Sequence, residues 1–589
     1  MAAPSTLHYQ PLLGTNDQSP TKKSTSSSRK TLYVFLSFVA IISPTAFVAL
    51  HFINPNLYHP SSSSSSSDLA SSLVPTHLCD RAHNPTSCLA MITEAVNGEE
   101  ERLGRLSDSH FLQIFLEKSV PRISNAMEVF NGFNGRSNDL KEKAALANCV
   151  KLMDLSIDRV TDSVMALKTQ STRSHADAHV WLSAVLTNHV TCLDGLSESS
   201  RLNEWTRLAV EMEMEDLIAR ARTSLAMIVA ISPPSSDHDD DGEELATWSM
   251  RKMITDRYPS WVTMRDRKLL EALPNDIIAN VTVAKDGSGN YTTVQEAVSS
   301  APDKSKTRYV IYVKNGTYEE NVEVGKKKKN VMMVGDGMNL TIITGSLNYI
   351  DGSTTWDSAT VAVDGDGFIA QDICFQNTAG AVKEQAVAIR VNADKVAINR
   401  CKMDAYQDTL YAHSQRSFYV DCSITGTVDF IFGNAAMVIQ NSTIIAREPL
   451  KGQSNMITAS GRTDSNQNTG ISIQNCDVIA SSDLSNTTKT YLGRPWKLYA
   501  RTVFMQSFLG DLIEPEGWSE WNGDYALDTL YYGEYDNWGP GSNTSNRVTW
   551  TGYHVITDPA VAENFTVAEL IQGEDWLNST GVPYTPGLF

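Results

Sequence analysis

Residues 401–434 read CKMDAYQDTLYAHSQRSFYVDCSITGTVDFIFGN, and similar residues recur in and around this stretch at a nearly constant interval. Asp408 and Asp429 are 21 residues apart. Gln385 precedes Gln407 by 22 residues. In a solenoid with coils of about this length, the two members of each pair stack on neighbouring coils, roughly 4.8 Å apart. Coincidence among common residue types is the alternative explanation, and only the motifs described below decide between the two.

Short β-rich runs continue on both sides of this stretch, from about residue 280 to the end. Asn, Asp and Gly separate them, which is typical of strands joined by turns. About 310 residues of brief strands without alternating helices exclude a doubly wound sheet. A propeller, a large sandwich or a β-helix remains. The runs are 310–313, 331–334, 341–344, 387–391, 418–420 and 471–473.

Residues 73–231 have a different, helical pattern. Seven apolar residues recur at alternating intervals of four and three, which places them on one face of a helix. A bundle of helices is therefore expected in this region. The seven residues are Leu146, Val150, Met153, Ile157, Val160, Val164 and Leu167.

The remaining segments are predicted to be tails, linkers and a targeting signal. Residues 1–30 form a polar tail, residues 53–72 a serine-rich linker and residues 232–270 an acidic linker. Residues 31–52 are mostly apolar and follow a basic stretch, which is typical of a membrane-targeting signal. A signal anchor is expected here in preference to a cleaved signal peptide. Either one directs the rest of the chain into an oxidising compartment.

Charge and cysteine content narrow the functional class. The 589 residues include 49 Lys and Arg against 68 Asp and Glu, a net charge of -19 that argues against a general nucleic-acid binder. Eight cysteines contain no CxxC pair, so zinc-ribbon and thioredoxin-like sites are not indicated. Nine N-x-S/T sequons, at Asn280, Asn290, Asn315, Asn339, Asn441, Asn486, Asn543, Asn564 and Asn578, favour the secretory route and a glycoprotein.

The usual esterase machinery is absent from the sequence. There is no G-x-S-x-G motif, and His413 and His554 are the only histidines after residue 270, so a Ser-His-Asp hydrolase is not expected. No HExxH motif indicates a zinc hydrolase. We predict no metal and no cofactor.

Three polar clusters with aromatic neighbours remain: YQDTLY at 406–411, VDFIFGN at 428–434 and LGRPW at 492–496. With these motifs the chain resembles the plant pectin methylesterases. Further blocks of that family are similar to residues 287–298, 376–380, 385–390 and 461–470, so the resemblance spans nearly all of residues 280–589.

This resemblance implies a right-handed parallel β-helix over residues 271–589 and hydrolysis of the methyl esters of cell-wall homogalacturonan. By motif position, Asp429 is the nucleophile and Asp408 the general acid and later the base. The resemblance also assigns roles to the remaining site residues. Gln385 and Gln407 are assigned to the oxyanion, Arg494 to catalysis and substrate binding, and Thr355, Gln385, Tyr411, Phe432 and Trp496 to the substrate.

Elementary electrostatics supports these roles. Two neighbouring carboxylates cannot both ionise easily, so one keeps a proton that it can give to departing methanol. An arginine beside Asp429 would keep that carboxylate ionised and nucleophilic. Glutamine amides suit an oxyanion because they donate hydrogen bonds without neutralising the attacking carboxylate.

Residues 73–231 resemble the invertase and pectin-methylesterase inhibitor family, a four-helix bundle. The resemblance implies disulfides between Cys79 and Cys88 and between Cys149 and Cys192. Arg267 and Lys268 resemble the dibasic processing site of esterases that carry such a pro-region. We expect the bundle to restrain or chaperone the enzyme until a protease cleaves there.

The chain departs from the esterase family at Ser442, where that family often has a cysteine. Cys422 is then free or paired elsewhere. Pairs of Cys374 with Cys401, or of Cys401 with Cys422, both remain open at this stage.

The expected partners are methyl-esterified pectin, the pro-domain, a processing protease and proteinaceous inhibitors. No nucleic acid is expected, and the membrane is contacted only through residues 31–52. The expected location is the secretory pathway and the cell wall, with the precursor anchored in the Golgi. A lyase or glycosidase on the same scaffold, or an inactive pectin-binding protein, are the alternatives.

Overall fold

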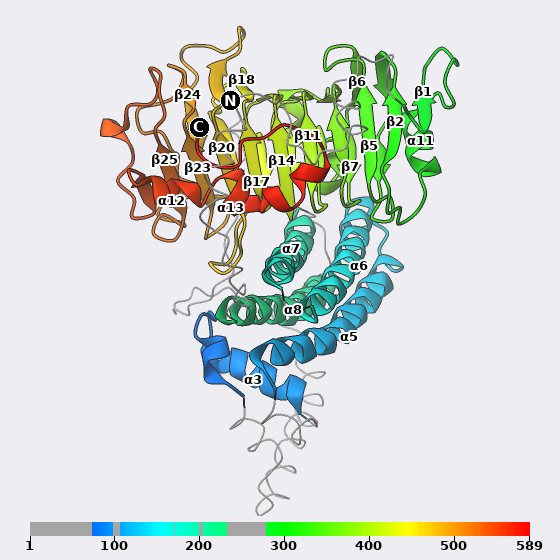
Figure 1. Cartoon of the computed structure of the whole chain (residues 1–589), viewed down its shortest axis with the longest axis vertical. Helices are drawn as coiled ribbons and strands as arrows, with labels where there is room; N and C mark the ends of the chain where they lie inside the picture. Colours follow the sequence, from blue (N-terminus) through cyan, green and yellow to red (C-terminus); the bar gives the residue numbers. More distant parts are fainter. Residues whose placement is uncertain (1–73, 98–105, 170, 199–203, 232–277) are drawn as a thin grey trace, which may run out of the picture. The chain divides into compact units, whose positions relative to one another are not determined.

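The computed structural model describes residues 74–97, 106–169, 171–198, 204–231 and 278–589 (Figure 1). The predicted segments 1–30, 31–52, 53–72 and 232–270, and with them Arg267 and Lys268, lie outside these ranges. Among the described helices, none has the length and apolar character needed to span a membrane. The described helices and strands all belong to one compact unit.

Four long helices form the predicted bundle, and each packs against two of the others in a closed ring. Side-chain oxygens of Asn84, Asp139 and Ser171 cap the first turns of three helices by accepting backbone N–H bonds. Five of the seven predicted stripe residues are fully buried in the bundle, and Val150 and Ile157 are partly buried. The helices are η1 (Thr76–Cys79), α3 (Pro85–Val96), α5 (Asp108–Asn134), α6 (Leu140–Leu167), α7 (Thr172–Ser197) and α8 (Glu204–Ala230).

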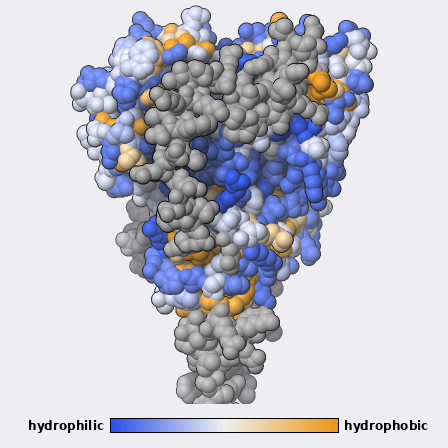
Figure 2. Space-filling model, in the orientation of Figure 1, coloured by the Kyte–Doolittle hydropathy of each residue, from blue (hydrophilic) through white to orange (hydrophobic). Residues whose placement is uncertain are grey.

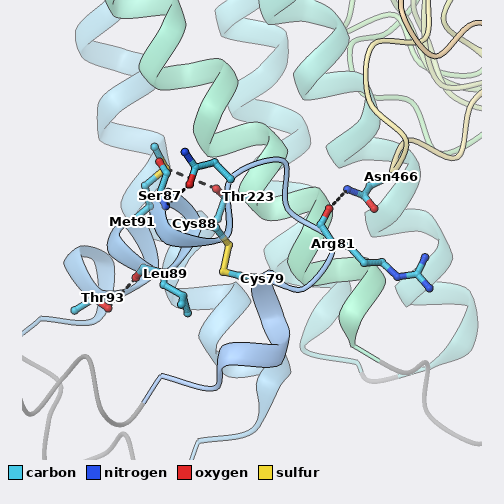
Figure 3. Close-up of a disulfide and its surroundings, with 10 residues drawn as sticks. Cys79, Arg81, Ser87, Cys88, Leu89, Met91, Thr93, Thr223 and Asn466 are labelled. Atoms are coloured by element: carbon cyan, nitrogen blue, oxygen red, sulfur yellow. Dashed lines mark hydrogen bonds between the residues drawn. A yellow bond between two sulfur atoms is a disulfide. The ribbon is translucent and has the colours of Figure 1, made fainter. Parts of the chain in front are cut away.

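Two disulfides fasten the bundle. Cys149 in α6 is joined to Cys192 in α7 across the helix pair. Cys79 is joined to Cys88 and ties η1 to α3, as Figure 3 shows. The same figure shows the Asn466 amide donating a 2.9 Å hydrogen bond to the backbone carbonyl of Arg81 beside this disulfide. The segment before α3 is therefore linked to the β-rich region as well as to the bundle.

After residue 280 the chain winds as a parallel β-helix, and successive coils place their strands in three parallel sheets. The fold predicted from the resemblance is thus the fold found. The eleven-stranded sheet contains β1 (Val281–Val283), β2 (Tyr309–Val313), β5 (Val331–Gly335), β8 (Ile369–Gln371), β11 (Val396–Asn399), β14 (Arg416–Val420), β17 (Ala436–Gln440), β20 (Gly470–Gln474), β23 (Arg501–Met505), β25 (Tyr531–Tyr535) and β26 (Tyr553–Val555).

The other two sheets complete each coil. The seven-stranded sheet contains β4 (Val322–Val324), β7 (Val361–Val363), β10 (Ile389–Val391), β13 (Leu410–Ala412), β16 (Ile431–Gly433), β19 (Asn455–Ser460) and β22 (Thr490–Gly493). The eight-stranded sheet contains β3 (Gly316–Glu319), β6 (Thr341–Gly345), β9 (Cys374–Asn377), β12 (Lys402–Asp404), β15 (Ser423–Gly426), β18 (Thr443–Ala446), β21 (Asp477–Ala480) and β24 (Phe508–Leu509).

The register of the seven-stranded sheet separates core from surface. Ile389, Leu410 and Ile431 stack on neighbouring coils and point into the apolar interior. The next residue in each strand points to the opposite face, as the alternation of a strand requires. Arg390, Tyr411 and Phe432 therefore form a ladder on the outer face, where they can meet a ligand or another part of the chain.

A repeated turn follows the eleven-stranded sheet. One residue per coil takes a left-handed conformation with φ near +50°, which turns the chain sharply into the next sheet. Five of these turns are at Arg400, Asp421, Asn441, Asn475 and Gln506.

The small residue after each of these turns points inward and bonds a carbonyl two residues back. Cys401, Cys422 and Cys476 do this with Sγ, and Ser442 and Ser507 do it with Oγ. Ser442 therefore fits its position as a hydrogen-bonding hydroxyl. Cys374, Cys401, Cys422 and Cys476 are all free and buried, so neither pairing left open by the sequence is formed.

Short helices cover parts of the β-helix. α11 (Val294–Ser300) packs on β1, β2 and β4, and α13 (Val567–Ile571) packs on β17 and follows α12 (Pro559–Glu563). Figure 1 shows α12 and α13 lying along the lower ends of the late strands. On the face drawn in Figure 2, hydrophilic residues predominate and hydrophobic residues form only small patches, which is ordinary for a protein surface.

Candidate active site

The strand register brings Asp408 and Asp429 together. Each lies two residues before a strand of the seven-stranded sheet, and Leu410 pairs with Ile431, so the two acids face each other on adjacent coils. The backbone N–H of Asp408 donates to the carbonyl of Val428 at 3.1 Å. The interval between the two acids is therefore one complete coil at this level of the solenoid. The geometry that the sequence predicted for this pair is the geometry found.

Both acids have unusual backbone conformations. Their φ angles are +66° for Asp408 and +51° for Asp429, in the left-handed region that residues other than glycine rarely occupy. Such strain is common at functional sites, where the surrounding fold holds it in place. Asp408 is 5% exposed and Asp429 is 6% exposed, so both residues are largely shielded from solvent.

Arg494 holds Asp429 with two parallel hydrogen bonds. Nε donates to Oδ1 at 2.8 Å and Nη2 to Oδ2 at 2.7 Å, the bidentate geometry that arginine forms best with a carboxylate. The guanidinium also lies over the ring of Trp521, 4.2 Å from its centroid. Burial alone would lower the pKa of Arg494, but the carboxylate of Asp429 outweighs burial and raises it. Arg494 therefore stays positively charged beside Asp429.

Asp408 has the opposite electrostatic character. Burial, and then the neighbouring charge of Asp429, raise the pKa of the Asp408 carboxyl well above its usual range. Asp408 therefore keeps its proton to a higher pH than an ordinary aspartate does, beside an Asp429 that is paired with a guanidinium. One acid that can donate a proton and one carboxylate that can attack now lie side by side.

Gln385 and Gln407 lie beside the acid pair on neighbouring coils. The backbone N–H of Ala386 donates to the carbonyl of Gln407 at 3.3 Å. The register of the neighbouring strands places Gln385 opposite Tyr406, one residue out of step with Gln407. The Gln385 Oε1 atom is buried and has no hydrogen-bond partner among the described residues, so this amide is open to rearrangement.

Aromatic side chains extend the site along the outer face of the sheet. Tyr411 stacks on Phe432 at 4.2 Å, and Phe432 meets Trp496 edge-on at 5.9 Å between centroids. Trp356 lies edge-on to Tyr411 and carries the guanidinium of Arg390 at 3.5 Å from its ring. The structure thus gathers the predicted substrate contacts Tyr411, Phe432 and Trp496 in one cluster.

Gly433 permits this close packing. Its φ is +122°, and a Cβ atom at this position would lie 2.0 Å from the backbone oxygen of Ala412 on the next coil. Only glycine therefore allows the two coils to approach directly behind Phe432. This explains the glycine of the VDFIFGN motif.

Helix α7 of the bundle covers the site. The carboxylate of Glu198, at the end of α7, accepts hydrogen bonds from the Thr355 backbone N–H at 3.1 Å and from the Thr355 hydroxyl at 3.0 Å. Trp356, Tyr411 and Phe432 are buried in the same apolar cluster as the bundle core. Thr355 is thus located at the site, as predicted, but its contact here is with the chain itself.

Burial raises the pKa of Glu198 to about 7, because the two bonds from Thr355 oppose burial only in part. Asp194 and Asp357 raise it further. Glu198 in turn contributes to the raised pKa of Asp408. The bundle therefore adds a third acid to the site.

Ion pairs also join the bundle to the β-helix. Arg159 Nη2 lies 2.5 Å from Asp366 Oδ1, and Arg416 Nη2 lies 2.5 Å from Asp177 Oδ1. Lys326 Nζ lies 2.6 Å from Asp154 Oδ2. Basic and acidic partners come from both sides, so the contact is complementary in charge.

Glu198, Trp356 and Trp521 were not found from the sequence. Glu198 is one of several polar residues at a helix end, and no spacing connects it with the distant Thr355. Trp521 lies well beyond the LGRPW motif, in a region without a regular strand pattern. Among the described residues, no group of three or more His, Cys, Asp and Glu side chains is placed to hold a metal ion.

Comparisons with known proteins identify the family of the chain. A family model described as pectinesterase matches residues 280–574, and one described as plant invertase/pectin methylesterase inhibitor matches residues 74–227. A pectinesterase/pectinesterase inhibitor of Ficus pumila var. awkeotsang is 54% identical over 94% of this chain and 96% of its own. Pectinesterase/pectinesterase inhibitor 18 of Arabidopsis thaliana is 50% identical over 97% of this chain and 99% of its own.

A solved structure also resembles part of this chain. The pectin methylesterase from carrot is 59% identical, with a TM-score of 0.52, over 53% of this chain and 98% of the carrot chain. The chain belongs to the pectinesterase family and carries an inhibitor-family domain in front of its catalytic domain.

Proposed function

We propose that this chain hydrolyses the methyl esters of homogalacturonan with Asp429 as nucleophile and Asp408 as general acid and base. The family supplies the activity, and the single observation that carries the residue roles is the acid pair. One carboxylate accepts the bidentate hydrogen bonds of Arg494, while burial raises the pKa of the other.

In the first half of the reaction, a carboxylate oxygen of Asp429 attacks the ester carbonyl carbon. The resulting oxyanion accepts hydrogen bonds from the amides of Gln385 and Gln407. The bond to the methoxy group then breaks, Asp408 gives its proton to the leaving oxygen, and methanol departs. The acyl group remains on Asp429 as a mixed anhydride.

In the second half, Asp408 is ionised and acts as the base. It takes a proton from a water molecule that attacks the acyl carbon, and the bond to Asp429 breaks. The products are a free galacturonate carboxyl group, an ionised Asp429 and a protonated Asp408. One water molecule is consumed for each methanol released.

Tyr411, Phe432 and Trp496 would line the groove for the polymer, and Thr355 would contact a substrate group where Glu198 now lies. Because Glu198 and the bundle occupy this surface, we infer that the pro-domain restrains the enzyme until it is displaced. Cleavage by a protease after Lys268 would permit displacement, because residues 74–231 would no longer be tethered to residues 278–589.

The route to the wall remains part of the proposal. The segment 31–52 would target the precursor to the secretory pathway as a signal anchor, with the anchored precursor in the Golgi and the processed enzyme in the wall. Proteinaceous inhibitors of the same family as the bundle would find the same surface open once the pro-domain has left.

The test is methanol release from highly esterified pectin by fragment 271–589, compared with Asp429→Asn. The core of the β-helix contains no bundle residue, so the fragment keeps its own apolar interior. We expect the fragment to release methanol, and Asp429→Asn to reduce the rate by at least about 1,000-fold, since the nucleophile is lost. Equal activity of the two proteins would contradict the role of Asp429, and equal activity of full chain and fragment would contradict restraint.

A further inference from the structure

Arg447 follows β18 directly and reaches back two coils, to the segment that leads into the acid pair. In the eight-stranded sheet, β15 lies between β18 and β12. The backbone of Arg447 is held on both sides. Its N–H donates to the carbonyl of Gly426 at 3.0 Å, and its carbonyl accepts from the amide of Asn455 at 3.0 Å. The side chain therefore extends from a fixed base towards the residues that follow β12.

The guanidinium of Arg447 contacts three successive residues of that segment. Its Nη1 lies 3.3 Å from Oδ1 of Asp404 and 3.4 Å from the carbonyl oxygen of Ala405. Its Cζ lies 4.0 Å from the centroid of the Tyr406 ring, within the range of a cation–π contact. Arg447 is 23% exposed and Asp404 14%, so water weakens this ion pair less than one on an open surface.

The two residues after Tyr406 are Gln407, which donates to the oxyanion in the proposed reaction, and Asp408, its acid. The carbonyl of Tyr406 accepts from the Thr427 N–H at 2.9 Å and from the Thr409 hydroxyl at 3.1 Å. These two bonds fix the backbone of Tyr406 and leave its ring to other contacts. The left-handed turn at Asp408 is an unfavourable conformation that the surrounding structure must hold.

The charge of Arg447 is not what connects it to the acid. The pKa of Asp408 responds to burial, and then to the charges of Asp429, Glu198 and Arg494. Arg447 is not one of these charges. Its contacts therefore affect where Asp408 lies, and not the pH at which Asp408 loses its proton.

We propose that Arg447 is a positioning residue for the reaction, which holds the ring of Tyr406 and thereby sets the places of Gln407 and Asp408. This inference rests on the proposed function and adds to it a residue from another coil. A misplacement of about 1 Å in a reacting group can cost about 100-fold in rate. Gln407 and Asp408 act in the transition state, so their displacement lowers kcat while the binding of the polymer is kept.

The test measures kcat and KM for methanol release by fragment 271–589 carrying Arg447→Met or Arg447→Lys. Arg447→Met removes all three contacts, and we expect kcat to fall about 10- to 100-fold with KM changed by less than about threefold. In Arg447→Lys the charge beside Asp404 is kept, but one ammonium group cannot also meet Ala405 and Tyr406. A smaller loss in kcat, of about threefold, is expected there. The pH dependence of kcat should keep its position in both variants, because the charges that act on Asp408 are unchanged.

A double-mutant cycle with Tyr406→Leu identifies the residue through which Arg447 acts. Each single change should lower kcat, and the double variant should be about as slow as the slower single variant. Independent effects would multiply instead, and that result would contradict the proposed role of Tyr406. Thermal unfolding identifies any variant that does not fold, and Arg447→Lys and Tyr406→Leu keep the proposal testable if Arg447→Met is one of them.

Arg400→Met is the matched control. Arg400 holds Asp372 through Nε at 2.8 Å and Nη2 at 2.6 Å, at the turn that follows the eleven-stranded sheet. Its replacement also removes an arginine–aspartate contact between coils. The thermal unfolding midpoint should fall about as much as in Arg447→Met, while kcat should stay at the wild-type value.

The outcomes separate the positioning role from the proposed function. An unchanged kcat in Arg447→Met, or an equal loss of kcat in Arg400→Met, would show that Arg447 only stabilises the fold, while the esterase activity stands. If the wild-type fragment releases no methanol, the proposed function is wrong, and the positioning role is wrong with it.

Discussion

Glu198 should make the restraint by the pro-domain depend on pH, and its replacement by glutamine should remove that dependence. The carboxyl group has a pKa of about 7 when docked against Thr355, compared with an ordinary value of 4.5. Because the docked pKa is the higher one, the proton favours docking. Docking is strongest below about pH 4.5 and weakens as the pH rises from there to about 7.

The size of the effect follows from the shift. A difference of about 2.5 pKa units corresponds to about 3.4 kcal/mol, or about a 300-fold change in the docking equilibrium. The partial exposure of the side chain makes this an upper limit. Asp194 and Asp357 face Glu198 and oppose its ionisation, so they contribute to the same trend.

The assay is methanol release by the full chain divided by that of fragment 271–589, measured from pH 4.5 to 7.5. Division removes the pH dependence of the catalytic residues themselves. For the wild type the quotient should rise with pH. In Glu198→Gln it should stay low throughout, because the amide can accept from the Thr355 N–H and donate to its hydroxyl without ionising.

Glu117→Gln is the matched control, since Glu117 lies on α5 and pairs with Lys168 at 3.7 Å with both side chains exposed. It should behave as the wild type. A wild-type quotient that does not change between pH 4.5 and 7.5, or an equal rise in Glu198→Gln, would refute the reasoning.

Three further predictions concern the catalytic residue pair, the coil contact and the bundle. Arg494→Lys loses the bidentate geometry with Asp429 and should lower kcat of the fragment by about 10- to 100-fold with a smaller change in KM, and an unchanged kcat would contradict its role. Gly433→Ala places a Cβ atom against the backbone of Ala412. It should lower the free energy of unfolding of the fragment by more than about 2 kcal/mol in a urea titration. No change would show that the two coils can separate at this position. Loss of the Cys149–Cys192 bridge in a double serine variant should destabilise the bundle by about 2–4 kcal/mol. Thermal unfolding of the full chain measures this change, and the unfolding transition of residues 271–589 should stay where it is in the wild type.

The sequence predicted the solenoid because its signal is local and periodic. Asp408 and Asp429 recur at the length of one coil, and this interval fixes which residues stack without knowledge of any distant contact. A periodic pattern also predicted the buried face of α6, because its apolar residues recur at the period of a helix. The interval between Gln385 and Gln407 was a less accurate guide, because it is one residue longer than the coil at that level.

What the sequence did not predict depends on contacts between distant segments. Glu198 meets Thr355 only because a helix from the bundle docks on the sheet, and no repeat or motif encodes that meeting. His413 was noticed in the sequence only as a residue too isolated to form a triad. Its position beside Lys497 and under Thr191 depends on the register of two coils and on α7 together.

The protonation state of Asp408 tests the central claim most directly. Carboxyl carbons of aspartate can be labelled in the full chain and followed by NMR, with Asp408→Asn identifying the signal. We predict that this carboxyl group loses its proton at a pH well above that of an ordinary aspartate. A signal for Asp408 that titrates in the ordinary aspartate range would contradict the account.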